Sequence, residues 1–529
     1  MGGLGAGRIR AVAGAATVVF FVGLVAVSSH SVFGPSSGGG QAVSAGGGTG
    51  AVLGSALGAP GPPTSSASVG GPSSAASPGG GGAVAGIGGG AGGSGLSSGT
   101  PALGGAGLSG PSGSTGPAAP GSATGPLGQG VTATEIRVGF WTTEVASGCK
   151  SLGATGGAAA TGCQDETPLI KAVAAYVNAH GGIAHRKFVP VIYQSEGTSS
   201  TFDAQAQAAC TNLAEDNKVF VAASSFVAGR QLFSTCMARH GIPVLDPGYW
   251  PFDQAFYDSL NGLLFQPSRA RPERWLAAYV DGLAAQGFFT PGARVGLFRF
   301  DDPVFAHLTE TVLKPRLAAH GVTLVDQYAV SAAQDSAGLS DMAAQLNSGI
   351  VRFRSEAIDH VIFFDLGSEL SFFYFPEAEA QGYRPHYGLN SYQAFELLAE
   401  NAPKAQFAGA IGVGWTPGAD VPPAHDPGGN PQAVTCQKAF VAAGLAGGSG
   451  RSVLCDEAFL VTTALDATTD LTVNGLRAAI EGLGTSFLAP TAFATDLGPR
   501  HHDGAVALRY VKFDGGCGCF AYVGGLHPF

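Results

Sequence analysis

From about residue 135 onward, segments in which apolar positions recur every three or four residues alternate with short runs that are almost wholly apolar. Five times a helix-like segment ends in a polar residue and a glycine and leads into a strand-like run; these glycines are Gly181, Gly241, Gly287, Gly321 and Gly382. A glycine after the last helical turn takes the left-handed conformation that lets the chain reverse onto a sheet. The alternation predicts an α/β fold whose parallel sheets are covered by helices on both faces.

The pattern also gives approximate bounds for the elements. The predicted strands, several of them too apolar for a sheet with one wet face, cover residues 135–141, 188–193, 219–223, 242–245, 293–300, 322–330, 360–365, 409–413 and 505–513. The predicted helices show a helical period and cover residues 168–179, 202–215, 273–285, 304–319, 436–443, 457–468 and 473–483. This array is too long for one doubly wound sheet, so we divide it near residues 265–268 into two lobes.

The chain before these elements has a different composition. No acidic or basic residue occurs in the 124 positions between Arg10 and Glu135, and residues 1–130 hold 41 of the 84 glycines. Residues 34–130 are nearly all Gly, Ser, Ala, Pro and Thr, a composition that buries too little apolar area to offset the entropy of ordering. We expect a disordered tether whose root-mean-square span is roughly 50 to 60 Å.

Residues 1–33 have the pattern of an export signal. Arg8 and Arg10 precede an apolar run over residues 11–27, and Ala26 and Ser28 have the spacing of a peptidase site. The run is also long enough to span a bilayer, so cleavage and retention as a membrane anchor both stay open. No cysteine follows the run to carry a lipid. We expect an extracytoplasmic protein, secreted or held at the cell surface.

Charge and cysteine content limit the partners and the compartment. The net charge is −10, and only Arg8 and Arg10 among the charged residues precede residue 131, so the acidic excess lies wholly in the later part. This sign argues against nucleic acid or anionic lipid as a partner. All eight cysteines also lie in the later part, and an even number in an exported chain predicts disulfides.

Proximity along the chain is the guide to cysteine pairing. We expect Cys149 to pair with Cys163, Cys210 with Cys236, and Cys436 with Cys455. Loops of this size each stabilise a fold by about 3 kcal/mol in the chain-entropy view. Cys517 and Cys519 are separated by one residue, and three interpretations stay open: a structural bridge, pairing elsewhere, or a labile redox pair.

Three stretches carry a resemblance to a known family: residues 131–139 (VTATEIRVG), residues 176–193 and residues 206–223. In their order and spacing they resemble the type I periplasmic binding proteins, the branched-chain amino acid group of ABC-transporter receptors. The resemblance implies two Rossmann-like lobes with parallel central sheets and a ligand cleft between them. It also implies three crossings of the chain, with lobe one at 131–266 and 391–500 and lobe two at 267–390 and 501–529.

In open α/β sheets ligands bind at the carboxyl ends of the strands. Aromatic and hydroxyl side chains predicted at such ends are Trp141, Thr142, Thr143, Ser224, Ser225, Phe226, Tyr249, Trp250 and Trp415. Hydroxyl and backbone N–H groups hold a carboxylate or amide, and aromatic faces take an apolar or planar group. The alternative is that these aromatic residues pack the interface between lobes without touching a ligand.

The resemblance adds two residues of lobe two. Phe305 follows the acidic pair Asp301 and Asp302, where the family places an aromatic residue that closes over the ligand, commonly a tyrosine. Glu369 lies one position from the carboxylate that meets the ligand ammonium in amino acid receptors. The alternative for Glu369 is a solvated acid at a helix N-terminus. Phe305 and the aromatic strand ends favour a more apolar or aromatic solute than a branched-chain amino acid.

The sequence therefore predicts a binding protein with no catalytic residues. Residues 131–529 contain no zinc-protease, phosphate-loop, dinucleotide or serine-hydrolase motif, so we expect no enzyme, cofactor or metal. The run from His501 to Asp503 lacks further ligands, and we expect a surface turn there. The leading hypothesis is capture of a small solute by lobe closure and delivery to an ABC permease. The alternatives are a tethered sensor or surface receptor and, less favoured, an extracytoplasmic redox or metal enzyme.

Overall fold

The computed structural model describes residues 125–144, 165–196, 201–224, 230–248, 250–332, 338–365, 369–445 and 452–529. The predicted export signal, the tether up to residue 124 and the proposed pair of Cys149 and Cys163 lie outside these residues. Within the described residues, no helix combines the length and apolar character needed to cross a membrane. The folded part is built on two sheets, and we call each sheet with its helices a lobe.

Lobe one is built on a five-stranded parallel sheet in the order β2-β1-β3-β4-β5. Its strands are β1 (Glu135–Glu144), β2 (Lys187–Glu196), β3 (Val221–Ser224), β4 (Val244–Leu245) and β5 (Leu264–Phe265). Alternate residues of the short strands enter two different cores: Val221 and Ala223 pack on one face, and Ala222 packs on the other. Burial of both faces explains why these strands are apolar without alternation.

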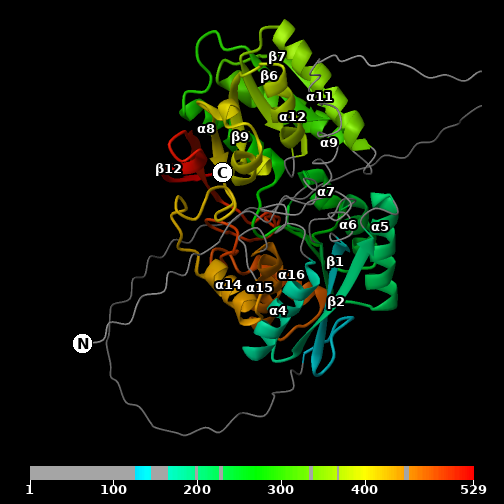
Figure 1. Ribbon diagram of the computed structural model, residues 1–529. Helices are drawn as coiled ribbons and strands as arrows, with labels where there is room; N and C mark the ends of the chain where they lie inside the picture. The colour runs from blue at the N-terminus through cyan, green and yellow to red at the C-terminus, as the bar shows by residue number, and fades with distance from the viewer. Residues whose placement is uncertain are drawn as a thin grey trace, which may run out of the picture. The chain divides into compact units, whose positions relative to one another are not determined.

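Among the described residues, seven helices cover the two faces of this sheet, and Figure 1 labels them. On one face lie α4 (Thr167–Ala179), α14 (Pro431–Ala442), α15 (Val453–Asp466) and α16 (Val473–Glu481). On the other lie α5 (Phe202–Cys210), α6 (Arg230–Arg239) and α7 (Gln254–Ser259). Lobe one is therefore assembled from two segments of the chain, one ending with β5 at Phe265 and the other beginning with α14 at Pro431.

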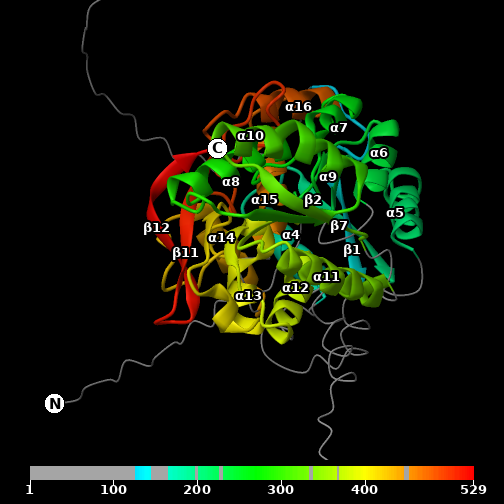
Figure 2. The same cartoon turned by 90° about the horizontal axis from the view of Figure 1, so that it is seen from above.

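Lobe two is built on a seven-stranded mixed sheet in the order β12-β11-β10-β9-β8-β6-β7. Its strands are β6 (Val295–Phe300), β7 (Leu324–Val330), β8 (His360–Phe364), β9 (His386–Asn390), β10 (Ile411–Gly414), β11 (Ala507–Asp514) and β12 (Cys519–Pro528). The first five are parallel to one another. The β11 strand runs antiparallel to β10 and forms an antiparallel hairpin with β12 at one edge, where the two lie beside each other in Figure 2.

The helices of lobe two are α8 (Pro272–Ala285), α9 (Pro303–Leu308), α10 (Lys314–Ala319), α11 (Gly338–Ser355), α12 (Glu369–Ala380) and α13 (Phe395–Asn401). Two of them, α11 and α12, pack side by side (Figure 2). The predicted helix over residues 304–319 is interrupted by a π-helical turn at Thr309–Leu313. This turn ends two residues before Pro315, whose nitrogen has no proton to donate to the preceding turn.

The five predicted reversals from helix to sheet are confirmed. Each helix concerned ends one or two residues before its glycine, and the backbone φ angles are 112° at Gly181, 70° at Gly241, 78° at Gly287, 74° at Gly321 and 63° at Gly382. Each is followed by a strand of its sheet. The positive φ angle explains the residue type, because a side chain disfavours this conformation.

The predicted end of lobe two at residue 390 is wrong. Residues 391–421 belong to lobe two rather than lobe one, because β10 pairs with β9 in the seven-stranded sheet. Phe395, Phe407 and Val421 are buried in the same core. The chain returns to lobe one only with α14, which packs against α4. The two-residue strand β5, the strand β9 and the C-terminal strand β12 were absent from the predicted set.

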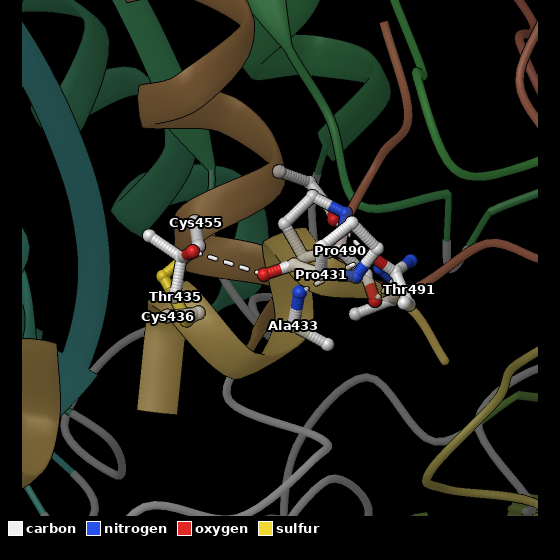
Figure 3. The surroundings of a disulfide bond; sticks show 9 residues. Pro431, Ala433, Thr435, Cys436, Cys455, Pro490 and Thr491 are labelled. Atoms are coloured by element: carbon white, nitrogen blue, oxygen red, sulfur yellow. Dashed lines mark hydrogen bonds between the residues drawn. A yellow bond between two sulfur atoms is a disulfide. The ribbon is translucent and has the colours of Figure 1, made fainter. Parts of the chain in front are cut away.

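Three disulfides lie within the described residues. Cys210–Cys236 joins α5 to α6, and Cys436–Cys455 joins α14 to α15, both as predicted. Figure 3 shows the second bond beside Thr435, whose hydroxyl donates to the carbonyl oxygen of Pro431 at 2.9 Å. The third bond joins Cys517 to Cys519 across one residue. Of the interpretations left open for this pair, the structure has the direct bridge.

Candidate functional site

Trp141 and Thr142, the first residues nominated in lobe one, have their side chains buried inside that lobe. The β1 strand continues to Glu144, so Trp141 and Thr142 lie within it rather than after it. Trp141 is 1% exposed, packs against Phe233 and donates from Nε1 to Ser195 Oγ at 3.2 Å. Thr142 is equally buried and donates to Glu166 Oε2 at 2.7 Å. Neither side chain is brought to the other lobe.

The end of β3 contributes to a buried polar network. The hydroxyl of Ser224 donates to Asp246 Oδ2 at 3.0 Å, just after β4. The other oxygen of Asp246 accepts from Gln266 Nε2 at 2.9 Å and from the backbone N–H of Gly248 at 2.7 Å. Ser224 and Asp246 are wholly buried. Ser224 was nominated as a ligand contact, but here it helps to hold a buried carboxylate.

This network extends to the segments where the chain crosses between lobes. Gln266 lies directly after β5, and its Oε1 accepts from the hydroxyl of Tyr257 at 2.7 Å. Its backbone N–H donates to the carbonyl oxygen of His502 at 2.8 Å, and its own carbonyl accepts from Gly504 at 2.9 Å. Thus two crossing segments, at residues 266 and 502–504, are bonded to each other. Hydrogen bonds therefore link the strand ends of lobe one to these crossing segments.

Trp250 and Phe305, both nominated, meet where the two lobes come together. Trp250 follows β4 of lobe one, is partly buried, and packs against cores of both lobes. Its ring meets that of Phe305 edge to face, with centroids 5.8 Å apart. Its Nε1 is buried and has no hydrogen-bond partner within the described residues. A buried indole N–H without an acceptor costs stability, and a ligand oxygen removes that cost.

Phe305 lies on α9 and is wholly buried. Its ring also contacts Phe300 and Phe364, with centroids 5.3 and 4.6 Å away. Asp302 caps the helix by accepting from the backbone N–H of Val304 at 2.9 Å. The acidic residue before Phe305 therefore positions the helix that carries the aromatic side chain.

Tyr392 makes a second contact between lobes, and sequence reasoning missed it. Its hydroxyl donates to the carbonyl oxygen of Gly248 at 2.9 Å, two residues before Trp250. Its ring packs against Trp275 and Trp415 at 5.0 and 5.3 Å. Trp415 was nominated for the cleft but is 1% exposed and lies in the core of lobe two. The signal for Tyr392 was its position just after β9, a strand not in the predicted set.

The remaining nominations stay predictions. Ser225, Phe226 and Tyr249 lie outside the described residues. Thr143 lies in β1 and Glu369 begins α12, but their side chains are likewise outside what is described.

Buried carboxyl groups with shifted pKa values lie near the crossings. Burial raises the pKa of Asp456 on α15 to about 6, although Thr491 donates to it from both its backbone N–H and its hydroxyl. Burial also raises the pKa of Asp420, in lobe two, to about 7. Arg269, itself 2% exposed, is a positive charge that acts on both groups.

A pocket of about 320 Å³ lies beside the crossing segments rather than at the nominated residues. It is lined by Gln254, Tyr257, Asp258, Asn261, Gly262, Arg271, Arg477, Arg500, His502 and Asp503. The prediction of a surface turn is wrong for His502 and Asp503, which are 4% and 0% exposed. Asp503 accepts from Arg274 Nη1 at 2.6 Å, and burial lowers the pKa of His502. His502 and Asp503 thus connect the crossing segment at residues 502–504 to Glu481 and Arg274.

No known family profile matches the sequence, and no curated protein matches it. Among solved structures, the chain is similar to a branched-chain amino acid ABC transporter protein from Thermus thermophilus with bound valine. That match has 17% identity, a TM-score of 0.55, and covers 76% of this chain and 97% of that one. A solute-binding protein of an ABC transporter from Rhodopseudomonas palustris, in complex with p-hydroxybenzoic acid, matches at 13% identity and TM-score 0.54, over 75% and 97%.

A fatty acid ABC transporter substrate-binding protein from Thermomonospora curvata matches at 15% identity and TM-score 0.54, over 76% of this chain and 95% of that one. The chain therefore has the two-lobed α/β fold of type I periplasmic binding proteins, as the sequence predicted. At these identities the likeness shows the fold and leaves ligand and transport to be argued from the site.

Proposed function

We propose that this protein is an extracytoplasmic solute-binding protein that captures a small carboxylic acid with an apolar or aromatic body and delivers it to an ABC permease. The observation that carries the proposal is the junction of Trp250 and Phe305, at the carboxyl ends of strands in the two lobes. It combines aromatic surface with a buried indole N–H that has no hydrogen-bond partner in the part of the chain that the structure describes.

The chemistry of the junction supports this ligand class. The Trp250 N–H is a donor for a carboxylate or carbonyl oxygen. The rings of Trp250, Phe305 and Phe364 supply apolar faces and edges for the rest of the molecule. Similar structures hold valine and p-hydroxybenzoic acid, and another is named for fatty acids. Thr143, Ser225, Phe226, Tyr249 and Glu369 remain the proposed further contacts.

Thermal unfolding of the full-length protein tests the proposal. We expect one class among branched-chain amino acids, hydroxybenzoates and fatty acids to raise the melting temperature, because ligand binds only the native state. At 100 times the dissociation constant the gain is about 2.7 kcal/mol. If no compound of these classes shifts the transition of a folded sample, the proposal is wrong.

Tryptophan emission then locates the ligand. The active compound should change the emission of the wild type and of Trp141→Phe, because Trp141 is sealed within lobe one. The Trp250→Phe variant should lose most of the change and bind more weakly. Trp141→Phe is the matched control, since it also removes an indole N–H near a strand end. An unchanged response in Trp250→Phe contradicts the proposed site.

A further inference from the structure

The tip of the β11–β12 hairpin brings two sulfur atoms and a histidine together. Cys517 and Cys519 are joined by a disulfide, and the ligating atoms of His425, Cys517 and Cys519 all lie within 4.8 Å of one another. His425 comes from a different segment, the stretch between β10 and α14. Two cysteines and a histidine are a donor set for zinc and other thiolate-binding ions.

The turn that carries the sulfur atoms is held by its own hydrogen bonds. Asp514 accepts from Gly516 through Oδ1 at 2.7 Å and from Gly518 through its carbonyl oxygen at 2.8 Å. Gly518 has a φ of 63°, the left-handed conformation that lets two cysteines on either side face one way. These two bonds do not involve the sulfur atoms. We therefore expect the turn to keep its conformation, and to hold both thiols close together, after the disulfide is reduced.

A positive charge lies over the same turn. A Cβ atom built on Gly518 would lie 2.6 Å from Nζ of Lys404, so the ammonium group sits against the middle residue of the pair. A nearby ammonium favours the thiolate, which is both the nucleophile in disulfide exchange and the metal ligand. Cys517 is also exposed to solvent. The disulfide is therefore open to attack at Cys517, while Cys519 is buried.

The molecule contains a second constellation of the same composition. Cys210, Cys236 and His240 also place their ligating atoms within 4.8 Å of one another. There, however, Cys210 is wholly buried, and His240 lies 3.5 Å from Glu215. That bridge spans 26 residues, against 2 for Cys517–Cys519. A longer closed loop restricts the unfolded chain more, so opening it costs the fold more.

We propose that the hairpin tip is a reducible thiol pair that, once reduced, binds a zinc-like ion through Cys517, Cys519 and His425. A dithiol reductant attacks the exposed sulfur of Cys517, and Cys519 leaves as a thiolate. The second thiol of the reductant resolves the mixed disulfide, so two electrons pass to the protein and the reductant becomes a disulfide. The metal ion then replaces the two thiol protons and takes a neutral imidazole nitrogen, leaving its fourth position to water.

The first step of the test is selective reduction of the full-length protein. A mild dithiol treatment under native conditions is followed by alkylation and peptide mapping. We expect alkyl groups on Cys517 and Cys519 while Cys210 and Cys236 remain bridged. Alkylation of Cys210 before Cys517 would falsify the reducible-pair part of the proposal.

The second step is zinc binding. Competition with a chromophoric chelator should give one Zn²⁺ for the reduced protein, and the oxidised protein and a Cys517→Ser/Cys519→Ser variant should lack that site. Loss of the imidazole in His425→Ala should weaken binding at least about tenfold. The matched variant His240→Ala should bind zinc as tightly as the wild type. Cd²⁺ in place of Zn²⁺ should add a thiolate charge-transfer absorption only when Cys517 and Cys519 are present and reduced.

Two results overturn the metal site: zinc binding that survives in the double cysteine variant, or equal effects of His425→Ala and His240→Ala. Thermal unfolding of each variant distinguishes loss of a ligand from loss of the fold. Ligand-induced stabilisation of the same variants measures solute binding separately, so failure of the metal site leaves the proposed solute site untouched.

Discussion

The strand ends of the two lobes differ in what fills them. In lobe one they are polar: Ser224, Asp246 and Gln266 form one buried network that reaches the crossing segments. In lobe two the strand ends add large aromatic rings to such bonds: Trp415 packs against Trp275, beside the hydrogen bond from Ser391 to the buried Asp420. Hydrogen bonds need fixed geometry, whereas aromatic packing depends on filled volume. Hydrogen bonds thus link lobe one to the crossing segments. Lobe two instead has an aromatic wall, formed by Trp275, Tyr392 and Trp415.

Because of this difference between the lobes, a position near a strand end does not by itself indicate that a residue contacts a ligand. Ser224 and Trp415 both make their contacts within their own lobes. Ser224 donates a hydrogen bond to Asp246, and Trp415 packs in the core of lobe two. Trp250 packs against both lobes, and its buried indole N–H has no partner among the described residues. A free bonding capacity, rather than position alone, distinguishes a candidate ligand contact from a structural residue.

The largest effect should come from the aromatic wall. Trp415→Ala removes a wholly buried ring between Trp275, Tyr392 and Phe529, and we expect a loss of about 3 to 5 kcal/mol of unfolding free energy. Urea unfolding measures it, and Trp415→Phe, which keeps a smaller ring, should lose less. A cost below about 1 kcal/mol for Trp415→Ala would mean that the wall does not support lobe two.

The polar network should give the next largest effect. Ser224→Ala removes one donor to the buried carboxylate of Asp246, and we expect a loss of about 1.5 to 3 kcal/mol, the range for hydrogen bonds to charged groups. Ser234→Ala is the matched control, because the Ser234 hydroxyl is also buried but has no partner within the described residues. It should leave stability unchanged or raise it. Equal losses in both variants would contradict the network's role.

Periodicity and glycine placement were sufficient to predict an α/β fold with helix-covered sheets, because apolar periodicity and a left-handed helix end leave local signals in the sequence. The two-lobed arrangement with three crossings was taken from the family resemblance. Two of the elements that were missed have weak local signals. The β12 strand contains two adjacent glycines, and the α12 helix is apolar on most sides and contains Pro376. The error in the limits of lobe two arose because strand order depends on long-range pairing of β10, which no local pattern records.

From the sequence we could predict that site residues lie near the ends of strands, but not which of them are available to a ligand. Sequence locates Trp141 near the end of β1 but does not reveal that the strand continues to Glu144. Nor does it reveal that Ser195 accepts from the Trp141 indole, or that Tyr392 reaches Gly248. Those partners lie 54 and 144 positions away, so only the assembled fold decides which polar groups are already satisfied.

The smallest effect should be a pH dependence in lobe two. Asp420 accepts from Thr416, Ser391 and Tyr522, yet burial raises its pKa from 3.8 to about 7. The folded protein therefore holds this proton more tightly than the unfolded chain, and the contribution of Asp420 to stability falls as the pH rises from about 4 to about 7.

An Asp420→Asn variant cannot ionise at this position, so its unfolding free energy should fall less over that interval than that of the wild type. One titrating group changes the free energy by at most about 1.4 kcal/mol per pH unit, which bounds the difference between pH 5 and pH 6. Urea unfolding of both proteins at those two pH values measures it. Glu396, whose pKa burial also raises to about 7, is present in both proteins and largely cancels. A wild type that gains stability relative to the variant as the pH rises would show that hydrogen bonding to Asp420 outweighs its burial.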